Sequence, residues 1–163
     1  MSPLPTAARM RVRQATAADV SAIAALIDEQ VRRGNLLPRP AAAIRQTIAD
    51  WLVAVQDGEL VGCVSLLPYT SGLVEVRSLA VHERAQGNGA GRALMEAALA
   101  EARRRNIPTL FALTRVVGFF HRFGFSVSDR SLFPEKVWRD CRQCPLIDHC
   151  DETAMVLHLN KES

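Results

Sequence analysis

Val74-Glu-Val-Arg-Ser-Leu-Ala-Val81, followed shortly by Gln86-Gly-Asn-Gly-Ala-Gly91, is the most informative part of this 163-residue chain. The first segment is rich in apolar and β-branched residues and predicts a strand from Leu73 to Val81. The second is a glycine-rich turn, and the amphipathic residues that follow it to Arg105 predict a long helix opening at about Gly89. Glycines allow close approach to the backbone, and a helix N-terminus carries partial positive charge. The sequence therefore predicts an anion site, suited to a phosphate, at this turn.

Further helices and strands flank this motif. A capping box at Thr16–Asp19, followed by apolar residues at helical spacing, predicts a first helix that Gly34 ends. A second helix is expected from Pro40 toward Asp50. Asp57-Gly58 is a hairpin signal. The other expected elements are strands over 51–56, 59–67, 109–113 and 153–159 and a short helix over 116–123. We expect one α/β domain with a mixed (α+β) sheet over 1–163, with a loose tail at 1–9 and an irregular, cysteine-containing insert at 130–152.

Composition and charge exclude several classes of protein. With 48% apolar and 23% charged residues, the chain is neither intrinsically disordered nor fibrous. No run approaches the ~18 apolar residues of a membrane span, and the first residues lack the apolar stretch of a secretory signal, so we expect a cytoplasmic protein. The net charge of +3 comes without basic stripes interleaved with aromatic residues, so we expect no nucleic-acid partner. The run Arg103-Arg-Arg105 closes a helix, where cations favour the helix dipole.

The glycine turn departs from two familiar phosphate loops. It lacks the Gly-Lys-Ser/Thr of a P-loop, and Gly87, Gly89 and Gly91 do not satisfy the dinucleotide pattern Gly-x-Gly-x-x-Gly. It does match Gln/Arg-x-x-Gly-x-Gly/Ala, and with the preceding strand, the following helix and Phe119-Phe-His-Arg-Phe-Gly-Phe125 it resembles the GNAT acetyltransferases. A generic strand–turn–helix is the alternative. The resemblance implies the GNAT acyl-CoA N-acyltransferase fold and binding of acetyl-CoA through Leu79, Ala80, Val81, Gln86, Gly87, Asn88, Gly89, Ala90, Gly91 and Arg92.

A narrower resemblance extends over roughly residues 10 to 160. Phe111-Ala-Leu-Thr-Arg115, Leu132-Phe-Pro-Glu-Lys136 and Gly34-Asn-Leu-Leu-Pro-Arg39 are similar to motifs of the short, single-domain N-acetylglutamate synthases. This resemblance implies acetyl transfer from acetyl-CoA to the α-amine of L-glutamate, the entry to arginine biosynthesis. Two alternatives stay open: an acetyltransferase for another amino acid or amine, and a regulatory module that binds acetyl-CoA without turnover. The sequence leaves the oligomeric state open, with a homodimer as one expectation.

Glu75 is the candidate general base, because GNAT enzymes often place a glutamate on this strand and the ammonium of the acceptor must lose a proton before it attacks. A cross-strand charge partner on a solvated face is the alternative role. The resemblance also implies that a backbone N–H near Leu79 or Val81 polarises the thioester carbonyl. Many GNAT enzymes carry a tyrosine where this chain has Phe120, so we assign no general acid.

The acceptor site is expected to contain arginines, because the guanidinium fork matches a carboxylate. GNAT topology brings the segments of Arg39, Arg77 and Arg115 to the acceptor cleft. Arg39 and Arg115 also match arginines of the synthase motifs. Each of the three could instead be an ordinary surface residue.

Cys141, Cys144 and Cys150 form a cluster within ten residues. Thiolates at this spacing can share a structural zinc, with His149 or the distant Cys63 as a fourth ligand. A knot of buried thiols or a redox-sensitive pair is the alternative.

Overall fold

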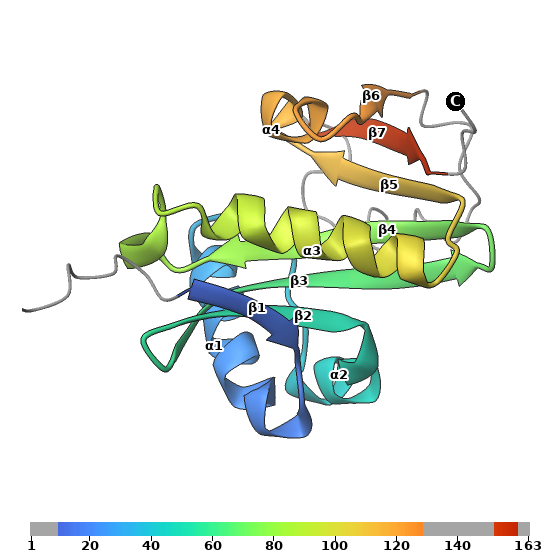
Figure 1. Ribbon diagram of the computed structural model, residues 1–163. Helices are drawn as coiled ribbons and strands as arrows, with labels where there is room; N and C mark the ends of the chain where they lie inside the picture. The colour runs from blue at the N-terminus through green and yellow to red at the C-terminus, as the bar shows by residue number, and fades with distance from the viewer. Residues whose placement is uncertain (1–9, 129–151, 160–163) are drawn as a thin grey trace, which may run out of the picture. The chain divides into compact units, whose positions relative to one another are not determined.

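The computed structural model describes residues 10–128 and 152–159 (Figure 1). The strands of this part are β1 (Met10–Gln14), β2 (Trp51–Gln56), β3 (Glu59–Thr70), β4 (Leu73–Val81), β5 (Thr109–Thr114), β6 (Ser126–Val127) and β7 (Thr153–His158). The α-helices are α1 (Val20–Arg32), α2 (Ala41–Gln46), α3 (Ala90–Arg104) and α4 (Val117–His121), and the 3₁₀ helices are η1 (Ala17–Asp19), η2 (Ile48–Asp50) and η3 (Glu83–Ala85). The predicted tail at 1–9 and all but the last residue of the predicted insert lie outside the described residues.

The strands form one mixed sheet in the order β1-β2-β3-β4-β5-β7-β6, in which β4 and β5 run parallel. This confirms the predicted α/β fold with a mixed sheet. The residues group into two compact units: unit 1 holds the residues up to Ser65 and Ser78–Ala100, and unit 2 holds Leu66–Arg77 and the residues from Glu101 onward. Strands β3 and β4 and helix α3 contribute to both. That 1–163 is a single domain stays a prediction.

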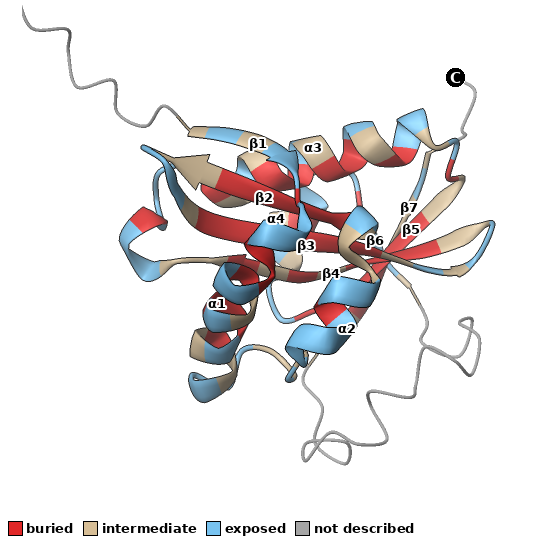
Figure 2. Cartoon of the chain, turned by 90° about the horizontal axis from the view of Figure 1, so that it is seen from below, coloured by how far each residue is buried: buried red, intermediate tan, exposed pale blue. Residues whose placement is uncertain are grey.

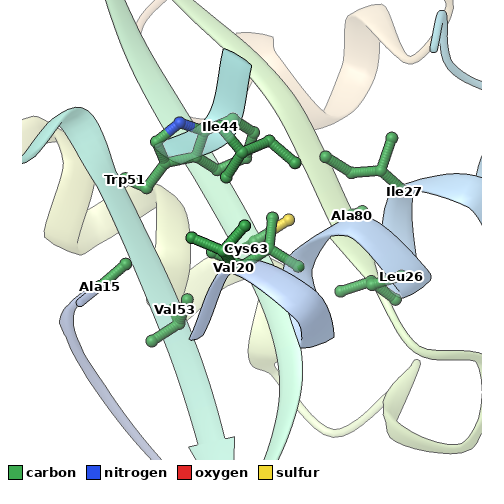
Figure 3. Packing of buried hydrophobic residues seen from close by; sticks show 10 residues of the cluster. Ala15, Val20, Leu26, Ile27, Ile44, Trp51, Val53, Cys63 and Ala80 are labelled. Atoms are coloured by element: carbon green, nitrogen blue, oxygen red, sulfur yellow. The ribbon is translucent and has the colours of Figure 1, made fainter. Parts of the chain in front are cut away.

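Unit 1 carries helices on both faces of its strands (Figure 1). Val53 of β2 and its partner Cys63 of β3 are fully buried, in one cluster with Val20, Ile27 and Ile44 of α1 and α2 (Figure 3). The adjacent pair, Ala54 and Gly62, faces the other way because side chains alternate along a strand. There Gly62 lies against Leu94 of α3. Thus α1 and α2 cover one face and α3 covers the other, with exposed residues on the outer sides of α1 and α2 (Figure 2).

The predicted start and end of the first helix are confirmed. Thr16 and Asp19 form the capping box, in which the Thr16 N–H donates to Asp19 Oδ2 at 2.8 Å. Arg13 donates to both carboxylate oxygens of Asp19, and these hydrogen bonds lower the pKa of Asp19 below its ordinary value. The chain turns from η1 into α1, and Gly34, at φ +76°, follows the end of the helix in the left-handed region that favours glycine.

Two boundaries and one whole strand differ from the prediction. Helix α2 ends at Gln46, before the expected Asp50, because the Thr47 hydroxyl donates to the Ala43 carbonyl and competes for the helical hydrogen bonds. Strand β3 continues to Thr70, three residues beyond its expected end. Strand β1 was not predicted, because a five-residue strand with only Met10 and Val12 as apolar residues carries too short an alternation to recognise.

Unit 2 is built around β5, which pairs with β4 on one side and with β7 on the other. Its residues Leu110, Phe111 and Ala112 are fully buried or nearly so. Helix α4 packs against β6 and β7, and Phe120 meets Phe125 edge to face at 5.2 Å between ring centroids. The short β6 was not predicted. The helix predicted over 116–123 is present but shorter, at Val117–His121.

The arginine run closes α3, as predicted. Arg104 and Arg105 both donate to Glu101 one turn earlier, and these hydrogen bonds lower the pKa of Glu101 to about 2. Two of the three guanidinium groups therefore neutralise a carboxylate on their own helix. No helix among the described residues is both long enough and apolar enough to cross a membrane.

Gly62→Ala is expected to destabilise the protein by about 1–3 kcal/mol, because overpacking a core costs that much. The added Cβ would lie 2.8 Å from Leu94 Cδ1 and 3.1 Å from the Ala80 carbonyl oxygen, so buried atoms must move. Gly72→Ala is the matched control, since its Cβ would meet Pro108 Cγ at an ordinary 3.7 Å. Urea denaturation of both variants measures the effect. Equal midpoints for the two variants would mean that α3 does not need a glycine at position 62.

Candidate functional site

The turn between β4 and α3 has the backbone conformation that the glycines predict. Gly87 and Gly89 both lie at φ +85°, where residues with a Cβ are strained, although a Cβ at either position would meet only open space. The glycines are thus required by the backbone conformation and not by crowding. Residues Gln86–Gly89 are exposed, whereas Ala90, the first residue of α3, is buried.

The N-terminus of α3 offers a row of donors. The first helical hydrogen bond joins the Ala93 N–H to the Gly89 carbonyl at 2.9 Å. The N–H groups of Ala90, Gly91 and Arg92 precede this bond and have no partner within the helix. The exposed Arg92 side chain, which pairs loosely with Glu96 at 3.5 Å, adds a mobile positive charge beside them. This arrangement can hold the phosphates of a ligand.

Contacts within unit 1 hold the segment before the turn. Arg33, directly after α1, donates to Glu83 of η3 at 2.6 Å, which lowers the pKa of Glu83 below its ordinary value. Arg84 pairs with Glu59 of β3, and Gln86 Nε2 donates to the Val81 carbonyl at 3.3 Å. Gln86 therefore ties the turn back to the end of β4, a role that the motif alone did not indicate.

The end of β4 is irregular at Ser78, which lies at φ +57°. A serine in this region is uncommon and signals local strain or a bulge. Its carbonyl accepts a hydrogen bond from the Cys63 thiol at 3.5 Å. The regular alternation is therefore interrupted immediately before Leu79, Ala80 and Val81, of which Ala80 is buried and the other two are half-buried.

Glu75 is buried in unit 2, with only 7% of its surface exposed. Its Oε1 accepts a hydrogen bond from the Tyr69 hydroxyl at 2.9 Å, and Arg77 Nη1 lies 3.9 Å from the same oxygen. The sequence left open that Glu75 is a charge partner on a solvated face. The structure excludes a solvated position, because the carboxylate is buried. A buried, hydrogen-bonded carboxylate near a second charged group is a candidate functional group.

The parallel ladder between β4 and β5 ends at Glu75. Its three pairs run from Leu73–Thr109 to Glu75–Phe111, although both strands continue beyond them. Because register partners in parallel strands share a face, the Glu75 and Phe111 side chains lie on the same side of the sheet. The candidate base thus stands where two neighbouring strands stop pairing.

The three candidate arginines lie in different parts of the fold. Arg77 is next to Glu75 and has 20% of its side chain exposed. Arg115 is exposed and directly follows β5, where Thr114 Oγ1 accepts from the Val116 N–H. Arg39 belongs to unit 1, half-buried in the segment between α1 and α2, with Nη1 donating to the Pro38 carbonyl. That the three converge on one ligand stays a prediction.

The cysteine cluster falls outside the described residues, so zinc binding by Cys141, Cys144 and Cys150 stays a prediction. Among the described residues, no group of three or more His, Cys, Asp or Glu side chains is placed to hold a metal ion. Cys63 lies fully buried in the core of unit 1, where burial raises the pKa of its thiol to about 12. Such a thiol packs as a small hydrophobic side chain.

Tyr69 was missed by the sequence analysis as a partner of Glu75. It is the only tyrosine in the chain and lies six residues before Glu75, across the turn at Ser71 and Gly72. The sequence signal for this contact was a polar aromatic residue at the end of one strand of a hairpin, together with an acidic residue on the next strand. Their contact depends on side-chain directions that the pattern does not contain.

Comparison with known proteins places this geometry in a family. Residues 23–125 match the acetyltransferase (GNAT) family. An uncharacterized N-acetyltransferase of Chlorobaculum tepidum is 41% identical over 145 residues, covering 89% of this chain and 94% of that protein. An amino-acid acetyltransferase of Ralstonia nicotianae is 36% identical over 116 residues, covering 70% of this chain but only 26% of that protein.

Among solved structures, the fold is similar to an N-acetylglutamate synthase from Neisseria gonorrhoeae in complex with coenzyme A and N-acetyl-glutamate. The two agree with a TM-score of 0.82 at 29% identity, over 93% of this chain and 35% of the synthase chain. The present chain therefore spans about a third of that relative. The glycine turn and the mixed sheet agree with these similarities. The chain belongs to the GNAT family of acetyltransferases.

Proposed function

We propose that this protein transfers the acetyl group of acetyl-CoA to the α-amine of L-glutamate and so makes N-acetylglutamate. The observation that carries the proposal is the similarity of nearly the whole chain to an N-acetylglutamate synthase in complex with coenzyme A and N-acetyl-glutamate. In the synthases this product is the entry to arginine biosynthesis. Because the chain matches only part of those longer relatives, the acceptor is the part of the proposal most in need of a test.

The glycine turn is the proposed binding site for the pyrophosphate of acetyl-CoA. The N–H groups at the start of α3 donate to phosphate oxygens, and the helix dipole favours the negative charge. Arg92 adds a charged contact. Leu79–Val81, at the end of the strand that leads into the turn, lie beside the pantetheine and thioester, where a backbone N–H polarises the carbonyl.

Glu75 is the proposed general base. The acceptor arrives as an ammonium ion, and Glu75 takes one proton from it, directly or through a water molecule. The free amine then forms a bond to the thioester carbon, and the carbon–sulfur bond breaks. Coenzyme A leaves as a thiolate, and the second proton that the amide nitrogen loses balances the one that the thiolate takes up. The buried position of Glu75 beside the Tyr69 hydroxyl supports this role, because carboxylates in such surroundings are common at functional sites.

Arg39, Arg77 and Arg115 are the proposed contacts for the two carboxylates of glutamate. Two-pronged pairing between a guanidinium and a carboxylate gives both charge and orientation, which holds the amine for attack. In this arrangement Arg77 serves two partners, since it also approaches Glu75.

Gly89→Asp is expected to weaken coenzyme A binding by at least about tenfold, because it adds a negative charge and strain where the pyrophosphate binds. Gly58→Asp is the matched control: it too puts aspartate at a glycine of positive φ facing open space, but in the β2–β3 hairpin. Calorimetric titration with coenzyme A measures both. If the two variants bind equally well, the turn does not hold the cofactor.

Glu75→Gln is expected to lower kcat by about a hundredfold or more at neutral pH while leaving acetyl-CoA affinity unchanged, since a general base typically contributes ~10²–10⁴ in rate. The loss should shrink as pH rises, because the acceptor amine then deprotonates in solution. Asp57→Asn, an exposed carboxylate-to-amide change in the hairpin turn, controls for charge. A variant that keeps the wild-type pH–rate profile and rate would remove Glu75 from the chemistry.

Glutamate should be preferred over glutamine by about ten- to a hundredfold in kcat/KM, because the amide loses a charge-assisted contact worth ~1.5–3 kcal/mol. A screen of amino acids by thiol release from acetyl-CoA tests this. Arg39→Ala, Arg77→Ala and Arg115→Ala should each raise the KM for glutamate and spare coenzyme A binding, whereas Arg45→Ala, on the exposed side of α2, should change neither. A better rate with glutamine or a monocarboxylic amino acid would overturn the glutamate assignment, and no thiol release with any amine would favour a binding module.

A further inference from the structure

Tyr69 joins an apolar contact and a polar contact in one side chain. Its ring packs against the fully buried Phe111 of β5, with the ring centroids 5.6 Å apart and the planes inclined at 44°. Its hydroxyl donates to Glu75 Oε1 at 2.9 Å. All three residues belong to unit 2. The ring contact therefore sets the position from which the hydroxyl reaches the carboxylate.

Glu75 needs such a donor. A buried ionised carboxylate is costly unless it is hydrogen-bonded or paired. The groups near it include the Tyr69 hydroxyl from β3, the Arg77 guanidinium from its own strand and the apolar ring of Phe111 from β5. The Tyr69 contact is the short one, since Arg77 Nη1 is 3.9 Å away. Both of these contacts reach Oε1, and the short hydrogen bond from Tyr69 orients that oxygen.

We propose that Tyr69 is the positioning residue for Glu75, holding its carboxylate in the direction in which it takes a proton from the incoming amine. The proposal rests on the proposed function, in which Glu75 is the base. Tyr69 itself exchanges no proton with the substrate. By donating to the carboxylate, the hydroxyl also stabilises the charged form in its buried position.

The first test needs no substrate. Because Tyr69 is the only tyrosine, the absorbance change on phenol ionisation reports this residue alone. In Glu75→Gln the ionisation midpoint should fall by about one pH unit, because the phenolate no longer meets a neighbouring negative charge. Asp57→Asn should leave the midpoint as in the wild type. Equal midpoints in Glu75→Gln and wild type would mean that the two side chains do not interact, and would overturn the proposal.

The second test is kinetic, with acetyl-CoA and the amino acid that supports the fastest thiol release. Tyr69→Phe keeps the ring on Phe111 and removes only the hydroxyl. We expect kcat to fall about tenfold, with an unchanged KM for acetyl-CoA, because a hydrogen bond to a charged group is lost. The acid limb of the kcat/KM profile should move to higher pH, since the carboxylate loses a donor that favours its ionised form.

A double-mutant cycle separates the two proposals. In the Glu75→Gln background, Tyr69→Phe should cause no further loss, because a positioning residue acts only through its partner. If Glu75→Gln lowers kcat but Tyr69→Phe changes neither kcat nor the acid limb, the positioning role is wrong while the base assignment stands. If Glu75→Gln itself leaves kcat unchanged, it is the base assignment of the proposed function that fails.

Discussion

The contact between the Gly62 backbone and Leu94 sets how closely α3 lies on β3, and the glycine turn depends on that distance. A Cβ at Gly62 would lie 2.8 Å from Leu94 Cδ1 and 3.1 Å from the Ala80 carbonyl oxygen, so a side chain there would force these atoms to shift. Leu94 and Met95 are fully buried, so the helix is held along its first turns. A helix fixed at that end presents its N–H groups in a constant direction, and such preorganised donors are what a phosphate site requires. Packing of α3 on β3 thus supports the proposed phosphate site at the start of α3.

A second constraint is the burial of a charge. Glu75 is buried, and a buried ionised carboxylate is costly unless it is hydrogen-bonded or paired. A short hydrogen bond from Tyr69 and a longer approach by Arg77 offset this cost. By contrast, the hydrogen-bonded ion pair of Glu101 with Arg104 keeps that carboxylate ionised even in acid, with a pKa of about 2, and so unsuited to accept a proton. The two carboxylates therefore differ in environment, and the proposed base is the buried one.

The sequence predicted most of the elements because their patterns are local. Amphipathic spacing, the Thr16–Asp19 capping box and Gly34 sufficed for α1, and β-branched residues sufficed for β4. The failures are the short or polar elements. Strand β1 has an alternation too brief to recognise, β6 has two residues, and α2 was overestimated because the Thr47 hydroxyl competes with the helix. Such elements owe their structure to pairing with distant strands or to a single side chain.

The candidate site also has one part that the sequence predicts and another part that only the structure shows. The sequence by itself determined the glycine turn, because positive φ at Gly87 and Gly89 and the open N–H groups of a helix start follow from local residue types. It also pointed to Glu75, though through resemblance to a family. Only the tertiary structure decided that Glu75 is buried, that Tyr69 donates to it, and that β4 and β5 stop pairing at that residue. These facts depend on which side chains meet across strands. That is set by register and packing between segments far apart in the chain, which no local pattern encodes.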